Sequence, residues 1–337
     1  MPKVYVTDLQ PRQTIESTFV ARTKQLAPFR NKPGAYLNMI LADKTGQIHA
    51  RAWDNAERIA ELFEAGDVVL VRGRVDEYQG APQLIVERLA KCDLDEIDIT
   101  DYLPTTPCDV RQLLATVEEV IATVGQPHLR ALLESFFADP KFVNRFSEAP
   151  GAKHLHHRYI GGLLEHVVSL LRIGQTVCDV HPNLDRDLFI TGIILHDIGK
   201  LEELDYGTSI DYTDRGRLIG HVVLGERMIR DRVRQMDAFP QDLAAMLSHV
   251  VLSHHGSREW GAPIVPMMPE AIALHYLDNL DAKVWQFTDI ARQAAAAGKT
   301  WSEWQRLLER YVYAGRVARE ADDYSDGQPP AQLGIEM

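Results

Sequence analysis

Polar and apolar residues alternate along much of the first 95 positions, whereas from residue 110 onward apolar residues recur at spacings of three and four. Alternation with a period of two is typical of half-buried β-strands, and the three-four spacing is typical of amphipathic helices. The chain therefore predicts a β domain followed by an α-helical part, a multidomain α+β protein. The predicted strands are residues 18–26, 35–43, 47–53, 68–75 and 83–86. The predicted helices are residues 55–63, 110–124, 129–137, 142–146, 157–180, 184–196, 221–229, 243–254, 269–295 and one that starts at residue 300.

The first 95 residues have five predicted strands with one helix between the third and the fourth, the pattern of a five-stranded OB-fold β-barrel. Such barrels hold single-stranded nucleic acid on an exposed face, where aromatic rings and arginine planes stack on bases. The residues expected on that face are Tyr36, Arg51, Trp53 and Arg72, with Phe29, Arg30, Lys32, Arg74 and Tyr78 as further candidates. The alternative is that Tyr36 and Trp53 belong to the barrel core and that the arginines only keep the surface soluble.

Composition and helical periodicity divide residues 96–337 into a linker, three helical parts and a tail. Residues 96–110 contain a stretch rich in proline and threonine and are expected to be a semi-rigid linker. Residues 111–153 are expected to be a helical connection, residues 154–284 an all-α domain, and residues 285–320 C-terminal helices. The last helix would place an aromatic stripe on one face, which either caps the helical core or forms the interface of a homo-oligomer. The stripe consists of Trp301, Trp304, Leu307, Leu308 and Tyr311. Residues 321–337, rich in Asp, Ser, Gly and Pro, are expected to be disordered.

Charge and cysteine content narrow the functional classes. The net charge of −12 argues against a generally basic nucleic-acid binder. Residues 1–95, however, contain 13 basic and 13 acidic side chains, so that segment is neutral and can still present a local basic face. No run approaches the roughly 18 apolar residues of a membrane helix. Three widely spaced cysteines favour neither a disulfide framework nor a thiolate metal site, and we expect a cytoplasmic protein.

Histidine is concentrated in one part of the chain, because 11 of the 13 histidines fall between His154 and His275. The pair His196-Asp197 ends an apolar run, where a helix should enter the core. A buried imidazole and carboxylate are costly unless they are paired or bind a metal. For an isolated pair, a satisfied hydrogen bond at a helix end would be the simpler interpretation, but the neighbouring histidines favour a metal site.

Four predicted helices each bring histidine or aspartate to a position at or near one end, and a fifth carries two further aspartates. Imidazole and carboxylate without thiolate form a ligand set for Mn²⁺, Fe, Co²⁺, Ni²⁺ or Zn²⁺, and helix bundles bind ions with side chains that project inward from several helices. Spacing alone does not prove that these residues converge, because the helices are far apart in sequence. The candidates are His166, His196, Asp197, His221, His254 and His255, with Asp278 or Asp281 from the predicted helix 269–295.

The order of these residues, with Gly199-Lys200 after the His-Asp pair in the string HDIGK, resembles the HD superfamily of metal-dependent phosphohydrolases over about residues 154–281. With the predicted OB-fold in front, the whole chain resembles the YhaM-type 3′–5′ exoribonucleases. The stretches that carry this likeness are KHLHH at residues 153–157, GGLLEH at 161–166, LSHHG at 252–256 and DNLDAK at 278–283.

The resemblance implies a metal-binding role for each of these residues. A first divalent ion would be held by His166, His196, Asp197 and Asp278. Asp197 would bridge to a second ion, held by His221, His254 and His255. Asp281, one turn beyond Asp278, is the alternative last ligand. HD proteins include members with one ion and members with two; Mn²⁺ is the favoured ion here, with Fe, Co²⁺, Ni²⁺, Zn²⁺ and Mg²⁺ open.

The same resemblance implies how the substrate is bound and cleaved. Lys200 would point a cation at a phosphate oxygen and offset transition-state charge, and Asp197 would orient the water or act as the base. His156 and His157 would contact the phosphate or orient a ligand. The implied reaction is hydrolysis of single-stranded RNA from its 3′ end to nucleoside 5′-monophosphates by metal-activated water, with single-stranded DNA an open second substrate. Two alternatives remain: an HD phosphodiesterase or phosphatase for small or cyclic nucleotides with a regulatory OB domain, and a non-catalytic nucleic-acid-binding protein.

Overall fold

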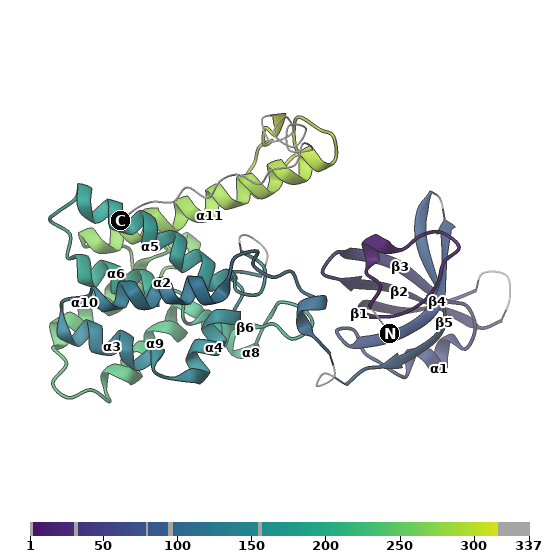
Figure 1. Cartoon of the computed structure of the whole chain (residues 1–337), viewed down its shortest axis with the longest axis horizontal. Coiled ribbons are helices and arrows are strands. Elements are labelled where there is room, and N and C mark those ends of the chain that lie inside the picture. The colour runs from purple at the N-terminus through teal and green to yellow at the C-terminus, as the bar shows by residue number, and fades with distance from the viewer. Residues whose placement is uncertain (1–2, 30–32, 79, 94–96, 154–156, 316–337) are drawn as a thin grey trace.

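The computed structural model describes residues 3–29, 33–78, 80–93, 97–153 and 157–315. It confirms the predicted order of a β-barrel followed by a helical domain (Figure 1). The barrel lies at one end of the molecule and the helical domain at the other, and the long helix α11 (Pro269–Ala296) extends outward from the helical domain. Within these residues, no helix is long and apolar enough to cross a membrane.

The barrel is closed in the strand order β1-β2-β3-β5-β4, with β3 and β5 parallel and the other neighbours antiparallel. This closed five-stranded arrangement is that of an OB-fold. Phe19, Leu41 and Val71 are fully buried in its interior, because alternate positions of each strand point inward. Each predicted strand is present, several of them longer than predicted. The strands are β1 (Thr14–Pro28), β2 (Ala35–Asp43), β3 (Gly46–Ala52), β4 (Val68–Tyr78) and β5 (Ala81–Lys91), and helix α1 (Ala56–Ala60) lies between β3 and β4.

One hydrophobic core unites the helices of the second domain. Side-chain caps fix several of their first turns, because Asp109, Asp139 and Asp185 accept hydrogen bonds from backbone N–H groups there. The helices before α11 are α2 (Val110–Ala122), α3 (Pro127–Phe137), α4 (Pro140–Glu148), α5 (Gly162–Val180), α6 (Arg186–Leu195), α7 (Lys200–Glu203), α8 (Asp214–Ile219), α9 (His221–Val233) and α10 (Gln241–Ser253). A hairpin of β6 (Leu204–Asp205) and β7 (Asp211–Tyr212) connects α7 to α8.

Helix α6 is the centre of this domain. Every residue from Leu188 to Leu195 is buried, and α5, α10 and α11 pack around the helix. A helix that is apolar on all faces belongs in the middle of a bundle. The C-terminal end of α6 therefore brings His196 to the middle of the domain.

The helix predicted from residue 157 begins later, at Gly162. His157 and Gly161 have φ angles of 48° and 81°, and residues with positive φ interrupt a right-handed helix. The residues from His157 to Gly161 therefore form a turn, and this turn directs the His157 side chain into the domain, where it is 3% exposed.

The helix predicted from residue 300 is wrong. In the described part of the C-terminal region, α11 ends just before Gly298, which has a φ of 68°, and the chain then folds back so that Trp301 bridges to Tyr313. The rings of Trp301 and Tyr313 are 5.0 Å apart, and those of Trp304 and Tyr311 are 5.1 Å apart. Aromatic residues form favourable pairs across antiparallel segments, so the stripe reflects these pairs and not one face of a helix.

The segment predicted to be a linker packs against the barrel. Tyr102 is 2% exposed, and its hydroxyl donates a hydrogen bond to Thr18 Oγ1 in β1 at 2.6 Å. Further along, the backbone N–H of Thr106 donates to the carbonyl of Ile160 at 2.8 Å. These contacts tie residues 102–106 to both domains. The predicted disordered tail, residues 321–337, lies outside the described residues.

Candidate metal centre

His196 and Asp197 lie where α6 ends, and both are buried. His196 donates its Nδ1–H to the carbonyl of Ile193 at 2.8 Å, and its Nε2 lies 3.3 Å from Asp197 Oδ2. Gly199 allows α9 to approach this point, because a Cβ atom there would lie 1.9 Å from the carbonyl oxygen of His221. The glycine that follows the His-Asp pair in sequence is therefore what lets His221 reach the pair.

Two clusters of candidate ligands meet at Asp197. Within each cluster the ligand atoms lie within 4.8 Å of one another; the clusters are His166, His196 and Asp197, and His221, His254 and His255. Asp197 Oδ1 lies 3.4 Å from His221 Nε2 and 3.7 Å from His254 Nε2. One carboxylate therefore contacts both clusters, and the histidines that the sequence singled out on four helices are brought together.

The second cluster is oriented by hydrogen bonds on its outer side. His254 donates Nδ1–H to the carbonyl of Val251 at 2.7 Å, and His255 donates Nδ1–H to the carbonyl of Trp260 at 2.8 Å. These bonds place the lone pairs of the Nε2 atoms toward the centre. Outer hydrogen bonds of this kind are typical of histidines that bind metals.

Glu203 was not among the predicted site residues. It lies at the end of α7 and accepts hydrogen bonds from the backbone N–H of His221 at 2.9 Å and from His221 Nδ1 at 3.0 Å. Burial alone would raise the pKa of Glu203, but its bonds with His221 hold the pKa below the usual range. In sequence Glu203 follows Glu202 in a short charged helix, where an exposed position is the ordinary expectation, so no local signal identifies it.

The two aspartates of α11 lie on opposite edges of the His166 ring. Asp278 Oδ1 is 3.2 Å from Nε2, on the side of the cluster, whereas Asp281 Oδ2 is 2.8 Å from Nδ1, on the outer side. Ser169 also donates a hydrogen bond to Asp281. Asp278 therefore lies where a further ligand would lie, and Asp281 lies where it can hold the ring in place.

Three atoms at the centre are buried and have no hydrogen-bond partner within the described residues: His196 Nε2, His254 Nε2 and Asp197 Oδ1. A buried polar atom without a partner costs about 1–3 kcal/mol. Imidazole nitrogens and carboxylate oxygens that converge in this way are donors for divalent transition metals. The residues present therefore fit a divalent metal ion.

The two clusters differ in their affinity for protons. Burial lowers the pKa of His166, but hydrogen bonds with Asp278 and Asp281 outweigh burial and raise it to about 9. Burial, together with the nearby His221, lowers the pKa of His255 to about 4. At neutral pH and without a metal ion, His166 is therefore protonated and His255 is neutral.

Lys200 lies one turn after Asp197 and is buried against it. Its Nζ is 2.5 Å from Asp197 Oδ2. Burial lowers the pKa of Lys200, but the charge of Asp197 outweighs burial and raises the pKa above its ordinary value. The lysine is therefore a cation fixed on the shared carboxylate, and its contact with a substrate phosphate stays a prediction.

His157 contacts the outer carboxylate of the first cluster. Its Nε2 lies 3.3 Å from Asp281 Oδ2, and its Nδ1 lies 2.8 Å from the Tyr159 hydroxyl. Its predicted role, to contact the phosphate or to orient a ligand, stays a prediction. His156 lies outside the described residues, so its contact with phosphate stays a prediction.

The barrel carries an aromatic cluster on its surface. The rings of Phe29, Tyr36 and Trp53 lie 5.0–6.1 Å apart. The Arg51 guanidinium is 5.4 Å from the centre of the Trp53 ring and 5.1 Å from that of Tyr78. Trp53 is 37% exposed and Tyr78 is 50% exposed. Tyr36 and Trp53 lie outside the barrel core, and the cluster has the composition of a base-stacking face.

Arg72 lies elsewhere on the barrel. It is on β4, opposite Glu16 of β1 and Arg88 of β5, and six positions before Tyr78 on the same strand, or about 20 Å at about 3.3 Å per residue. The structure therefore does not bring Arg72 into the aromatic cluster. Arg30 and Lys32 lie outside the described residues.

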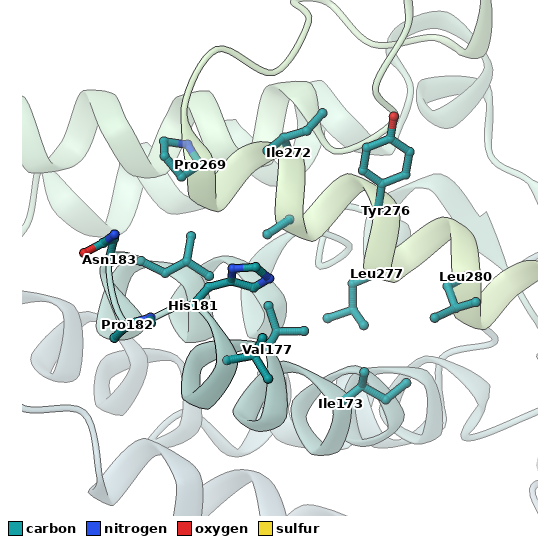
Figure 2. Close-up of a pocket in the computed structure, with 13 residues that line it drawn as sticks. Ile173, Val177, His181, Pro182, Asn183, Pro269, Ile272, Tyr276, Leu277 and Leu280 are labelled. Carbon is teal, nitrogen blue, oxygen red and sulfur yellow. The ribbon is translucent and has the colours of Figure 1, made fainter.

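A separate apolar groove of about 690 Å³ lies between the end of α5 and the start of α11 (Figure 2). Val177, Ile272 and Leu277 line it, and Tyr276 stands at its edge. The residues around this groove do not include those of the two histidine clusters. The groove is therefore distinct from the metal centre.

Comparisons with known proteins agree with both domains. Residues 163–283 match the HD domain family, and residues 18–91 match the family described as OB-fold nucleic acid binding domain. The first match contains every residue of the two histidine clusters and also Asp278. The second match covers most of the barrel.

Curated relatives match about three quarters or more of the chain. Over 250 residues the chain is 36% identical to the 3′-5′ exoribonuclease YhaM of Bacillus pumilus (strain SAFR-032), covering 74% of this chain and 79% of that protein. It is 36% identical over 280 residues to YhaM of Geobacillus sp. (strain WCH70), covering 82% and 85%. It is 34% identical over 250 residues to YhaM of Bacillus subtilis (strain 168), covering 74% and 79%. The chain belongs to the YhaM family of 3′-5′ exoribonucleases.

Proposed function

We propose that this protein is a divalent-metal-dependent 3′–5′ exoribonuclease that removes nucleoside 5′-monophosphates from the 3′ end of single-stranded RNA. The observation that carries the proposal is the convergence of two histidine clusters on Asp197, in a chain that also has an OB-fold barrel. The HD domain match and the relatives named as 3′-5′ exoribonucleases support the same reaction class.

Each cluster would hold one ion. The proposed ligands of the first ion are His166, His196, Asp197 and Asp278, and those of the second are His221, His254 and His255, with Asp197 shared. Asp281 and Glu203 orient His166 and His221 through their Nδ1 atoms. Mn²⁺ is the proposed ion, because it accepts imidazole and carboxylate ligands; Fe, Co²⁺, Ni²⁺, Zn²⁺ and Mg²⁺ are the alternatives to compare with it.

When bound, a divalent cation would supply Lewis-acid chemistry and lower the pKa of a coordinated water to about 7. Asp197 has a pKa well below its usual range: burial raises it, but the charges of Lys200 and His196 outweigh burial. The carboxylate is therefore ionised and can orient the attacking water. We propose that Lys200 offsets the negative charge that develops on the phosphate. Its position beside Asp197, at the metal centre, supports this role.

The barrel face would hold the strand upstream of the cleaved bond. Phe29, Tyr36, Trp53 and Tyr78 offer rings for stacking, and Arg51 offers a cation among them. Arg72 would add at most a separate phosphate contact. Stacking does not distinguish RNA from DNA, so single-stranded DNA is a second proposed substrate.

Two further properties remain proposals. The wide spacing of the three cysteines and the free thiols of Cys108 and Cys178 support our proposal of a reducing, cytoplasmic compartment. Trp301, Leu307 and Tyr311 are more than half exposed, and apolar surfaces of this kind are used in subunit interfaces. Sedimentation analysis of the full chain and of a Leu307→Glu variant would show whether it forms a homo-oligomer.

The test of the function is a cleavage assay with single-stranded RNA labelled at its 5′ end. With Mn²⁺, the expected result is a ladder of labelled products that shorten with time and release of nucleoside 5′-monophosphates. A His196→Ala variant should leave the RNA intact, and the same sequence as DNA measures sugar preference. The proposal is wrong if the RNA stays intact with both proteins, or if cyclic or free nucleotides are turned over and the RNA is not.

A further inference from the structure

The β6–β7 hairpin joins the metal centre to the barrel. Its first strand begins at Leu204, directly after Glu203, and its second strand leads into α8, which ends shortly before His221. At its turn, Thr208 donates a hydrogen bond to the carbonyl of Gly66 in the barrel domain. In Figure 1, β6 and α8 lie between the body of the helical domain and the barrel. A strand of RNA that reaches from the barrel to the metal centre would have this hairpin within reach.

Tyr212, on β7, is flanked by two cations. Lys153 Nζ lies 5.3 Å and Arg217 Cζ lies 6.0 Å from the centre of the Tyr212 ring. The ring belongs to a residue that is 39% exposed. Lys153 stands four residues before His157, and Arg217 stands four residues before His221, so both cations come from segments that enter the metal centre.

Asp211 balances one of these two charges. Its Oδ1 lies 2.6 Å from Lys153 Nζ and 2.9 Å from Arg217 Nη2. These hydrogen bonds lower the pKa of Asp211 to about 2, so the carboxylate is ionised at neutral pH. These three groups together carry a net charge of +1, and Asp205 of β6, which pairs with Asp211, adds a further carboxylate on the neighbouring strand.

The ion pairs alone would explain why the hairpin is ordered, but they do not explain the exposed ring between the cations. Burying an aromatic ring would stabilise the fold more than leaving it partly exposed. Lys153 and Arg217 lie over the ring, and exposed rings accompanied by cations are what single-strand binding proteins use: a ring stacks on a base and the cations contact the neighbouring phosphates.

We propose that Tyr212, Lys153 and Arg217 form a second contact site for single-stranded RNA, between the barrel face and the metal centre. Tyr212 stacks on a base, and Lys153 and Arg217 contact the phosphates on its two sides. The site rests on the proposed function, because its ligand is the strand whose 3′ end enters the metal centre. This site would bind the nucleotides near the cleaved bond, whereas the barrel binds nucleotides further upstream.

The test measures RNA binding in the full chain with the His196→Ala substitution, so that the oligonucleotide stays intact. The probe is a fluorescent single-stranded RNA of about 20 nucleotides, longer than the roughly 4–16 nucleotides that one OB-fold covers. Adding Tyr212→Ala should weaken binding at least about five-fold, the lower end expected for losing one base stack. Tyr212→Phe keeps the ring and should stay within about two-fold of the parent. Arg217→Gln should make the salt dependence shallower by about 0.7 in its logarithmic slope.

Two control variants distinguish a loss of the hairpin site from a general loss of exposed aromatic surface and from a loss of the barrel face. Tyr276→Ala removes another exposed ring, at the edge of the apolar groove that is distinct from the metal centre, and should leave the affinity unchanged, and the melting temperatures should show that every variant is folded. Trp53→Ala tests the barrel face. If Trp53→Ala weakens binding and Tyr212→Ala does not, the hairpin site is refuted and the proposed function stands. If the parent fails to bind RNA at all and the enzyme without the His196 substitution leaves RNA intact, the proposed function itself fails.

Discussion

Asp278 and Asp281 lie one helical turn apart on α11, and the structure predicts opposite consequences for their substitution. Asp278 faces the Nε2 edge of His166, where a metal ion would be bound, and Asp281 accepts a hydrogen bond from the Nδ1 edge. Asp278→Asn should therefore remove a ligand of the first ion. Asp281→Asn should leave every ligand in place and remove only the negative charge that holds the ring.

The size of the second effect follows from the contacts of Asp281. Its carboxylate accepts hydrogen bonds from His166 at 2.8 Å and from Ser169, and it contacts His157 at 3.3 Å. Removing an outer partner of a metal-bound histidine lowers metal affinity by about 10- to 100-fold, or about 1.4–2.7 kcal/mol. Asparagine keeps one acceptor oxygen for His166, so we expect Asp281→Asn near the lower limit and Asp281→Ala near the upper limit.

Titration calorimetry with Mn²⁺ measures both effects, and elemental analysis of dialysed protein counts the ions retained. The expected order of affinity for the first ion is wild type, Asp281→Asn, Asp281→Ala and then Asp278→Asn, with the second ion little changed by either substitution at Asp281. The reasoning is refuted if Asp278→Asn keeps both ions while Asp281→Asn loses one. That result would make Asp281 the ligand and Asp278 the outer residue.

Three further predictions concern the remaining parts of the site and the barrel. Glu203→Gln should weaken binding of the second ion by about 10- to 100-fold and leave binding of the first unchanged, because Glu203 accepts a hydrogen bond from His221 and, among the described residues, from no proposed ligand of the first ion. Equal loss of both ions in the calorimetric titration would contradict this. Gly199→Ala should destabilise the protein by about 1–3 kcal/mol and weaken the second ion, because its Cβ would lie 1.9 Å from the His221 carbonyl oxygen; a thermal unfolding curve that matches the wild type would exclude this clash. Binding of the first ion should release a proton at pH 7.5 and should strengthen as the pH rises towards about 9, because His166 must lose its proton to become a ligand. His255 is already neutral and should release no proton. Calorimetry in two buffers of different ionisation enthalpy counts the protons, and equal heats in the two buffers would contradict the raised pKa of His166. The same raised pKa means that the contribution of His166 to the stability of the metal-free protein is complete below pH 6.5 and is lost as the pH rises through about 9.

Most of the fold could be predicted from the sequence because its signals are local. Runs of β-forming residues, with strict alternation in one of them, located all five strands of the barrel, and an unbroken apolar run located α6. The three-four periodicity located α2, α10 and α11. The same signal was wrong after residue 300, where large aromatic side chains recur at helical spacing but pair across a chain reversal. Spacing does not distinguish these two arrangements, since the deciding event is the end of α11 before Gly298.

The site could be predicted only in part, because its geometry depends on contacts between distant segments. The ligand types were evident from sequence, but their division into two clusters required the family resemblance. Asp278 and Asp281 share one helix and one turn, so only the distances to the two edges of the His166 ring separate their roles. Glu203 had no signal at all, since its position beside His221 depends on how α7 and α9 pack.

Each of three residues near Asp197 in sequence has a structural role at the metal centre. His196 precedes it on the last turn of a fully buried helix, Gly199 admits the backbone of α9, and Lys200 neutralises one of its oxygens. The other oxygen is buried between two histidine clusters without a hydrogen-bond donor among the described residues. Stability alone does not explain this buried carboxylate, because a buried charge that lacks part of its partners costs several kcal/mol. The simplest physical account is that a divalent cation binds the free oxygen of Asp197 together with the histidines. Metal binding should then stabilise the helical domain: Mn²⁺ at about 100 times its dissociation constant should add about 2.7 kcal/mol to the free energy of unfolding. His196→Ala should abolish most of that gain.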